Sequence, residues 1–239
     1  MPWIERLRST YRVVAIDLPG HGLTQAPAGY AASMDSFVEV VEAIARELGL
    51  PRFVIVGNSM GGRVSWQYAL AHPQRLSGLV LIDSAGFADK RSANRAVLFR
   101  LMRIRVLRPL IRHLDVTVMA RQGLKAAFFD ERLVTPELVR RYTDLARGRG
   151  HREILISLPV RQTDRQLLER LSTIQTPTLV MVGEEDRLIP VAETQRFAEF
   201  IWGATLIRYP GVGHVPMEQI PDRSAHDLDR WIKTTVDLA

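Results

Sequence analysis

The sequence contains no cysteine, which removes one whole set of structures and reactions from consideration. Disulfide bonds, thiolate metal sites and thiol nucleophiles are all excluded. The six histidines are scattered without paired ligand spacing, which argues against a structural zinc site. No apolar run reaches the ~18 residues that a transmembrane helix needs, so we expect a cytoplasmic protein.

Lysine is also scarce, so the basic residues are nearly all arginine. The net charge is +6 and the isoelectric point is about 10.1. The arginines are interspersed with acids, as on a solvated surface, and no nucleic-acid-binding module accompanies them. We therefore expect no nucleic-acid partner. One basic amphipathic stretch, 94–114, leaves association with a membrane surface open as an alternative.

Apolar runs alternate with helical periodicity along the chain. The predicted strands, rich in Val, Ile and Leu, are 12–16, 53–56, 79–82, 178–182 and a weaker one at 205–209. The predicted helices are 33–48, with Ser33 as N-cap and Gly49 as its stop, 61–72, and two that follow Pro190 and Pro221. Strands without polar alternation are typical of parallel sheets covered on both faces. The pattern predicts an α/β fold with a doubly wound, mainly parallel sheet.

The stretch 87–174 interrupts this alternation, because it contains several amphipathic, arginine-rich segments and no convincing strand. We interpret it as a helical cap inserted into a core domain whose two parts are 1–86 and 175–239. Apolar cap residues expected to pack on the core or line a substrate pocket include Leu98, Leu101, Met102 and Leu110.

The sharpest motif is Gly57-Asn-Ser-Met-Gly-Gly62. A Gly-x-Ser-x-Gly match arises by chance in about one chain in twelve of this length, given ordinary glycine and serine usage. Here it follows an apolar run and opens a predicted helix, which is the strand–turn–helix context of a nucleophile elbow. Such a turn exposes the hydroxyl of Ser59 and points the backbone N–H of Met60 at a developing oxyanion. The alternative is a glycine-rich helix start in which Ser59 is only an N-cap.

A serine nucleophile needs a base, and the base needs an orienting acid. His214 lies in a glycine-containing loop after the last predicted strand, and Asp186 follows the strand at 178–182. Catalytic groups of open α/β sheets gather at the carboxyl ends of strands. Glu184 and Glu185 are rival acids, and we favour Asp186 because it lies deeper in the loop. The histidines without a comparable setting are His21, His72, His113, His151 and His226.

Read together, these residues resemble the α/β-hydrolase superfamily over essentially the whole chain. The segment Asp17-Leu-Pro-Gly-His-Gly22 is similar to the turn after that family's fourth strand, and 57–61 to its nucleophile elbow. The loop 183–186 is similar to its acid loop, Gly213-His214 to its histidine loop, and 87–174 to its helical cap. The combination is specific to the superfamily and not to one substrate.

One departure concerns the beginning of the chain. Members of the family carry about three strands before the one predicted at 12–16, and the third ends in a His-Gly loop that supplies a second oxyanion N–H. This chain begins at Met1-Pro-Trp-Ile-Glu5, which is similar to the end of the helix after that loop. The resemblance therefore implies a fold that is incomplete at its N-terminus, in which the strand at 12–16 lacks its usual neighbours.

The leading hypothesis is hydrolysis of a carboxylic ester through an acyl-enzyme, with a small hydrophobic substrate. His214 would take the proton of Ser59, Asp186 would hold the imidazole, and the Met60 N–H would help to bind the oxyanion. This chemistry needs no metal or organic cofactor. One alternative is a carbon–carbon bond hydrolase of ring-cleavage dienoates, whose elbows resemble this motif, although the aromatic residue that often follows their histidine is replaced by Val215. The other is a non-catalytic or inactive member of the fold.

Overall fold

The computed structural model describes residues 2–87, 115–158 and 165–237, and its centre is a parallel four-stranded sheet. The strands are β1 (Phe53–Asn58), β2 (Leu76–Ile82), β3 (Thr178–Gly183) and β4 (Thr205–Tyr209). They lie in the order β1-β2-β3-β4, and each neighbouring pair is parallel. Four of the five predicted strands are thereby confirmed, with β2 starting three residues earlier than the apolar run alone indicated.

The run at 12–16 does not form a strand, so this prediction is wrong. In the described part of the chain β1 pairs with β2 alone. Val13, Val14 and Ile16 remain 36%, 41% and 40% exposed. A strand exists only beside a hydrogen-bonded neighbour, and apolar side chains do not supply one.

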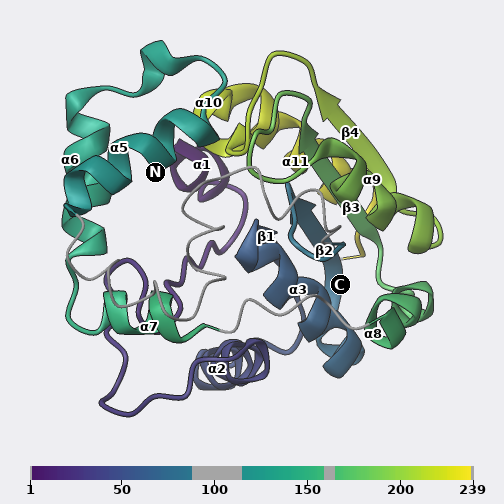
Figure 1. Ribbon diagram of the computed structural model, residues 1–239. Coiled ribbons are helices and arrows are strands. Elements are labelled where there is room, and N and C mark those ends of the chain that lie inside the picture. The colour runs from purple at the N-terminus through teal and green to yellow at the C-terminus, as the bar shows by residue number, and fades with distance from the viewer. Residues whose placement is uncertain (1, 88–114, 159–164, 238–239) are drawn as a thin grey trace.

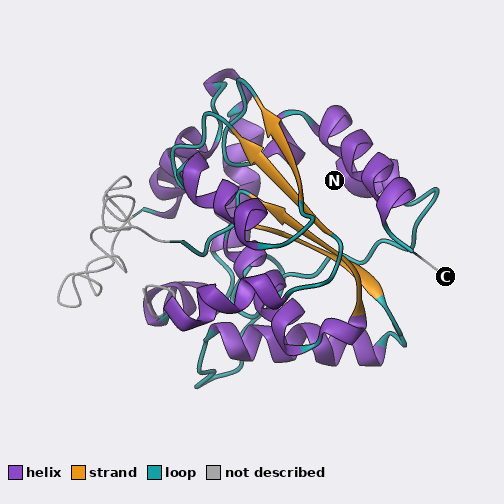
Figure 2. Cartoon of the chain, turned by 90° about the vertical axis from the view of Figure 1, so that its right-hand side faces the viewer, coloured by secondary structure: helices purple, strands orange, loops and turns teal. Residues whose placement is uncertain are grey.

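Helices cover both faces of the sheet (Figures 1 and 2). One face carries α2 (Met34–Glu47), α3 (Met60–Ala71) and α9 (Val191–Phe200). The other face carries α1 (Pro2–Leu7) and α11 (Pro221–Thr235), which pack against each other. The doubly wound α/β prediction is confirmed.

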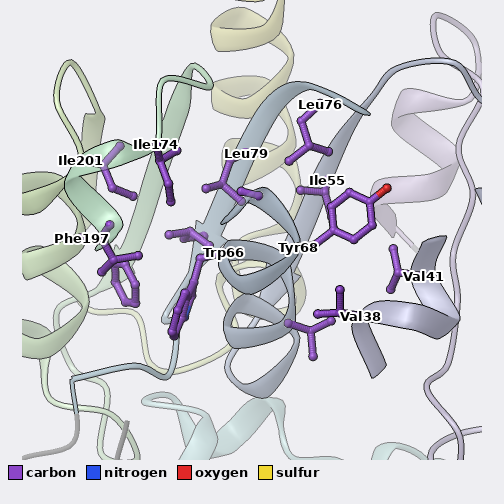
Figure 3. Close-up of a cluster of buried hydrophobic side chains, with 14 of the residues drawn as sticks. Val38, Val41, Ile55, Trp66, Tyr68, Leu76, Leu79, Ile174, Phe197 and Ile201 are labelled. Atoms are coloured by element: carbon purple, nitrogen blue, oxygen red, sulfur yellow. The ribbon is translucent and has the colours of Figure 1, made fainter. Parts of the chain in front are cut away.

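Alternate side chains of the central strands enter two separate cores. Leu79 and Leu81 of β2 face the α2, α3 and α9 side, where Figure 3 shows Trp66, Tyr68 and Phe197 packed beside the sheet. Val80 and Ile82 face the other side, and the same alternation continues into β3. All seven residues of β2 are buried, because a central parallel strand is covered on both faces.

Local capping explains where the helices begin and end. The hydroxyl of Ser33 accepts a hydrogen bond from the Ser36 N–H at 3.0 Å, and Ser36 Oγ accepts one from the Ser33 N–H at 2.9 Å. This reciprocal capping starts α2, as the sequence predicted. Gly49, with φ 61°, ends the helix in the left-handed conformation that glycine adopts without strain. The predicted helix after Pro190 and the one that begins at Pro221 are α9 and α11.

The described parts of the stretch 87–174 are mainly helical. Its helices are α5 (Val116–Ala127), α6 (Pro136–Ala146), α7 (His151–Ser157) and α8 (Arg165–Glu169). The remaining short elements are η1 (Pro73–Arg75), η4 (Glu131–Leu133), η5 (Arg170–Thr173) and α10 (Pro216–Gln219). Helices α5, α6 and α7 lie together at one side of the molecule in Figure 1. The amphipathic stretch 94–114, with its predicted pocket-lining residues, lies outside the described residues.

An ionic network around the buried Glu42 carboxylate joins α2 to α3 and η1. The Glu42 carboxylate, 5% exposed, accepts hydrogen bonds from Tyr68 Oη at 2.6 Å, Arg46 Nε at 2.6 Å and Arg75 Nε at 3.2 Å. The Tyr68 hydrogen bond is the main cause that lowers the pKa of Glu42 to about 2, with Arg46 and Arg75 adding to it against the effect of burial. The ionised form of Glu42 therefore stabilises the fold.

We expect Glu42→Gln to lower the free energy of unfolding by about 2 kcal/mol at pH 7, since three hydrogen bonds to a charged group are weakened. A carboxyl whose folded pKa lies below its unfolded value of ~4.3 contributes fully above that value, and the contribution is lost as the pH falls toward 2. The difference in the free energy of unfolding between the wild type and Glu42→Gln should therefore become smaller below about pH 4.3. Urea denaturation at pH 7 and pH 3.5 measures it.

Glu39→Gln is the matched control, because Glu39 lies on the same helix with its side chain exposed. Its effect should stay within about 0.5 kcal/mol at both pH values. An undiminished effect of Glu42→Gln at pH 3.5 would contradict the role given to the ionised carboxylate.

Candidate active site

Ser59 lies at a sharp turn between β1 and α3. Its φ of 55° and ψ of −117° are unusual for a residue with a side chain. The turn is fixed to the end of β2, because the Ser59 N–H donates to Ile82 O and the Ser59 carbonyl accepts from the Ala85 N–H, both at 3.0 Å. The Ser59 side chain makes no capping hydrogen bond to α3. The geometry is thus that of a strained backbone turn and not of an ordinary N-cap.

Met60 is the first residue of α3. The first N–H groups of a helix have no partner within the helix, and the helix dipole adds positive potential there. The Met60 N–H therefore belongs to a site that favours negative charge next to Ser59.

His214 and Asp186 form a buried pair. His214 Nδ1 and Asp186 Oδ2 are 2.7 Å apart, and the two residues are 5% and 6% exposed. The other carboxylate oxygen, Oδ1, accepts from the N–H groups of Leu188 at 2.7 Å and Ile189 at 3.0 Å. Both oxygens of Asp186 are engaged, so the acid is held in one orientation against the imidazole.

The rival acids are placed elsewhere. Glu184 Oε1 pairs with Arg208 Nε at 2.7 Å, and Glu185 is exposed. Of the three candidates in the loop, the structure brings only Asp186 to His214.

Other histidines with described surroundings have different contacts. His151 Nε2 lies 2.9 Å from Gly22 O, His72 packs its ring on Tyr68, and His21 packs edge-on against Phe37. His226 is exposed on α11, and His113 lies outside the described residues.

The loop that carries His214 is held from several directions. The His214 N–H donates to Ala127 O at 2.7 Å, at the end of α5. The Asn58 side-chain amide donates to His214 O at 2.9 Å and to Ile82 O at 3.1 Å. Gln219 Oε1 accepts from the Gly213 N–H at 3.1 Å. Val215 packs in an apolar cluster with α5 and α6, so these helices border the histidine loop directly.

Asn58, which the sequence reasoning did not assign, joins the turn that carries Ser59 to the loop that carries His214. It immediately precedes Ser59 and binds the backbone of His214. Ser59, Asp186 and His214 follow β1, β3 and β4, at the carboxyl edge of the sheet. Among hydrogen bonds between described residues, none joins Ser59 Oγ to His214. Such bonds commonly form only when substrate is bound.

Asp83 is a second acidic residue in the site that the sequence reasoning missed. It directly follows β2, is fully buried and has a positive φ of 41°. Its Oδ1 accepts from the Gly183 N–H at 3.0 Å, and its Oδ2 has no hydrogen-bond partner among the described residues. Burial raises the pKa of Asp83 well above its usual range, and the charge of Asp186 raises it further. Burial therefore favours the protonated form of Asp83.

A metal ion is a poor fit to these groups. Asp83, Asp186 and His214 each offer one ligand atom, and these atoms lie within 4.8 Å of one another. His214 Nδ1 and Asp186 Oδ2 already hold a proton between them in a 2.7 Å hydrogen bond. A divalent ion would have to displace that proton, so the donor set suits an acid–base pair better.

A span across a bilayer is not found in the described ranges, where each helix is either too short or too polar for one.

Comparison with known proteins agrees with this geometry. A family model described as alpha/beta hydrolase fold matches residues 2–219. The dihydrolipoyllysine-residue acetyltransferase component of an acetoin cleaving system from Pseudomonas putida is 31% identical over 216 residues. The match covers 87% of this chain and 53% of that protein, so the chain spans about half the length of this relative.

Two further proteins match over most of their length. A 2-hydroxymuconate semialdehyde hydrolase from Pseudomonas putida is 28% identical over 237 residues, which cover 95% of this chain and 79% of that one. The solved structure of a meta-cleavage product hydrolase from Pseudomonas fluorescens IP01 has a TM-score of 0.82 and 26% identity. It covers 97% of this chain and 83% of its own. The chain therefore belongs to the α/β-hydrolase fold family.

Proposed function

We propose that the protein is a serine hydrolase that cleaves a carboxylic ester through an acyl-enzyme. The observation that carries this proposal is the buried 2.7 Å pair of His214 and Asp186, joined through Asn58 to the turn that carries Ser59. A carboxylate can only accept a hydrogen bond, so the imidazole donates through Nδ1. Its Nε2 is then the lone pair that takes the proton of Ser59.

In the proposed reaction, Ser59 Oγ attacks the ester carbonyl while His214 Nε2 accepts its proton. The negative charge on the carbonyl oxygen develops beside the Met60 N–H, at the positive end of α3. Collapse of the tetrahedral intermediate returns the proton to the departing alcohol. Water, deprotonated by His214, then hydrolyses the acyl-enzyme. The chain's own side chains and backbone supply every proton transfer, so no cofactor enters the proposal.

The apolar cluster beside His214 favours a small hydrophobic acyl or alcohol group. Leu124 and Phe128, at and just beyond the end of α5, pack there with Val215, next to the base. Burial of apolar substrate surface against such helices is the usual source of affinity in a pocket of this kind.

A second candidate function, cleavage of a carbon–carbon bond in a ring-cleavage dienoate, is favoured by the relatives. The 2-hydroxymuconate semialdehyde hydrolase and the meta-cleavage product hydrolase are 28% and 26% identical to this chain. The same serine, histidine and aspartate would serve both reactions, so the side chains of the triad do not separate them.

Labelling by a fluorophosphonate probe tests the nucleophile. We expect the wild-type chain to be labelled, and Ser59→Ala to abolish labelling because the probe reacts only with an activated hydroxyl. Ser172→Ala is the control, since Ser172 is an exposed serine on η5, and it should label like the wild type. Undiminished labelling of Ser59→Ala would contradict the assignment, and a folded wild type that is never labelled would support a non-catalytic member.

A pair of substrates separates the two reactions. Short-chain p-nitrophenyl esters and a 2-hydroxy-6-oxo-dienoate are compared by kcat/KM on the same preparation. If the protein is an ester hydrolase, kcat/KM should be at least about tenfold higher for the best ester than for the dienoate. This ratio corresponds to about 1.4 kcal/mol of transition-state stabilisation. The reverse ratio would assign the protein to carbon–carbon bond hydrolysis.

A further inference from the structure

The backbone of the loop that carries His214 lies directly against the end of α5. The His214 N–H donates to Ala127 O at 2.7 Å. A Cβ added at Gly213 would lie 2.3 Å from Ala127 O and 2.8 Å from the Phe129 nitrogen, so the two backbones touch without a side chain between them. Residues 127–129, which we call the α5 exit segment, therefore cannot shift without breaking a contact to this loop or moving the loop with them.

A single side chain joins the α5 exit segment to the histidine loop. Gln219, the last residue of α10, uses its Oε1 to accept hydrogen bonds from the Phe129 N–H and the Gly213 N–H, both at 3.1 Å. Its Nε2 donates to Gly211 O at 2.8 Å. The oxygen meets only donors and the nitrogen meets an acceptor, so these partners fix the orientation of the amide. One atom of Gln219 thus sets the distance between the two segments.

The preceding residue connects the same short helix to α6. Glu218 Oε1 accepts from Tyr142 Oη at 2.5 Å, and Glu218 Oε2 accepts from Arg141 at 2.8 Å. Helix α10 is therefore held by α6 through Glu218 and by the α5 exit segment through Gln219. It follows His214 directly in the chain, so both connections bear on the position of the imidazole.

The stability of the fold does not explain the Phe129 hydrogen bond. Phe129 is 41% exposed, and Gln219 is only half-buried. An exposed N–H bonds to water at almost no cost, so this hydrogen bond adds little to the free energy of unfolding. What it supplies is a fixed geometry. A catalytic group that is misplaced by about 1 Å can lose 10² in rate, so such geometry matters for a base on a loop.

We propose that Gln219 is a positioning residue that fastens the histidine loop to the α5 exit segment, so that His214 reaches Ser59 only while this segment is docked. This inference rests on the proposed function, in which His214 is the base. Phe128 of the apolar cluster beside the base belongs to the α5 exit segment. A substrate that packs against Phe128 therefore acts on the segment that positions the base.

Substitution of Gln219 separates positioning from substrate binding. Gln219→Met removes all three hydrogen bonds at nearly the same side-chain length. We expect kcat for the best ester to fall about 10–10²-fold while KM changes by less than about threefold, because the base is displaced and the substrate contacts remain. Gln219→Glu keeps an acceptor for both N–H groups and should restore kcat to within about fivefold of the wild type.

Gln122→Met is the matched control, because Gln122 is exposed on α5, and it should change kcat by less than about twofold. Thermal unfolding confirms that each variant is folded. A folded Gln219→Met with the wild-type kcat would overturn the inference. So would a Gln219→Glu variant that is as slow as Gln219→Met.

Replacement of Phe129 tests the connection to the α5 exit segment. Phe129→Pro removes the N–H that Gln219 accepts, and Phe128 already has the ψ of 130° that a following proline favours. Phe129→Ala keeps the N–H and accounts for the lost ring. We expect kcat of Phe129→Pro to be at least about fivefold below that of Phe129→Ala, and the two to differ by less than about twofold when combined with Gln219→Met. Equal differences in both backgrounds would refute the connection.

Hydrogen exchange of backbone amides gives a readout that does not depend on turnover. The acceptor of the His214 N–H, Ala127 O, is untouched in Gln219→Met, yet this amide should exchange at least about tenfold faster because the loop opens more often. The Leu48 N–H at the end of α2 should stay within about twofold. An unchanged His214 amide, or equal acceleration of both, would refute the role of Gln219. If the wild type hydrolyses no substrate, the proposed function fails, and the exchange rates still decide whether Gln219 holds the loop.

Discussion

His214→Ala is expected to lower kcat for ester hydrolysis by about 10⁶, the same loss as Ser59→Ala. The nucleophile and the base act as one unit, because a serine hydroxyl without a base is as unreactive as a base without a nucleophile. The geometry is consistent with this joint action, because the side chain of Asn58, the residue before Ser59, donates to the backbone carbonyl of His214. Initial rates on a p-nitrophenyl ester, with active-site titration of the wild type, measure the loss.

The double variant Ser59→Ala/His214→Ala should be no slower than either single variant. The remaining rate of the double variant would come from the Met60 N–H and from substrate binding. Together these should keep it about 10³–10⁴ times faster than the uncatalysed reaction. His226→Ala is the control, because His226 is exposed on α11, and it should keep kcat within about twofold. A His214→Ala variant that retained more than about a hundredth of the wild-type kcat would exclude His214 as the general base.

Local patterns were sufficient to predict most of the fold and the sharp turn that carries Ser59. The strands β1 to β3 consist mainly of apolar residues, and every residue of β2 and β3 is buried because these two strands are covered on both faces. The turn at Ser59 is encoded by Gly57 and Gly61, which lie within five consecutive residues. Neither feature needs information from a distant part of the chain.

Features that depend on distant partners were not predictable in this way. The run at 12–16 has the composition of a strand, but pairing depends on a neighbour that no local pattern reveals. Asn58 acts through a carbonyl 156 residues away, and Asp83 through an N–H 100 residues away. Nothing in the composition around either residue indicates these partners.

Asp83 could nevertheless have been found from the sequence. The rule that placed Asp186 in the site, an acid directly after a buried strand, applies equally to Asp83 after β2. The rule selects a position at the carboxyl edge of the sheet and does not say which of two acids meets the histidine. That choice is made by the backbone N–H groups of Leu188 and Ile189, which fix the orientation of Asp186.

The two outer glycines of the Gly-x-Ser-x-Gly motif should respond very differently to alanine. A Cβ at Gly57 would lie 2.2 Å from the backbone oxygen of Gly61 and 2.4 Å from Ser65 Oγ, so α3 would have to move away from β1. We expect Gly57→Ala to lower the free energy of unfolding by about 3 kcal/mol or more, the cost of inserting a methyl group into a packed backbone contact. In a protein of this size that shifts Tm down by roughly 6–12 °C.

Gly61→Ala is the matched control from the same motif. A Cβ at Gly61 meets nothing within 4 Å, and Gly61 lies in the first turn of α3. Alanine is a better helix former than glycine, so this variant should be as stable as the wild type or more stable by up to about 1 kcal/mol. Urea midpoints at unchanged m-values measure both changes. Equal stability of the two variants would mean that the close approach of α3 to β1 does not require glycine at position 57.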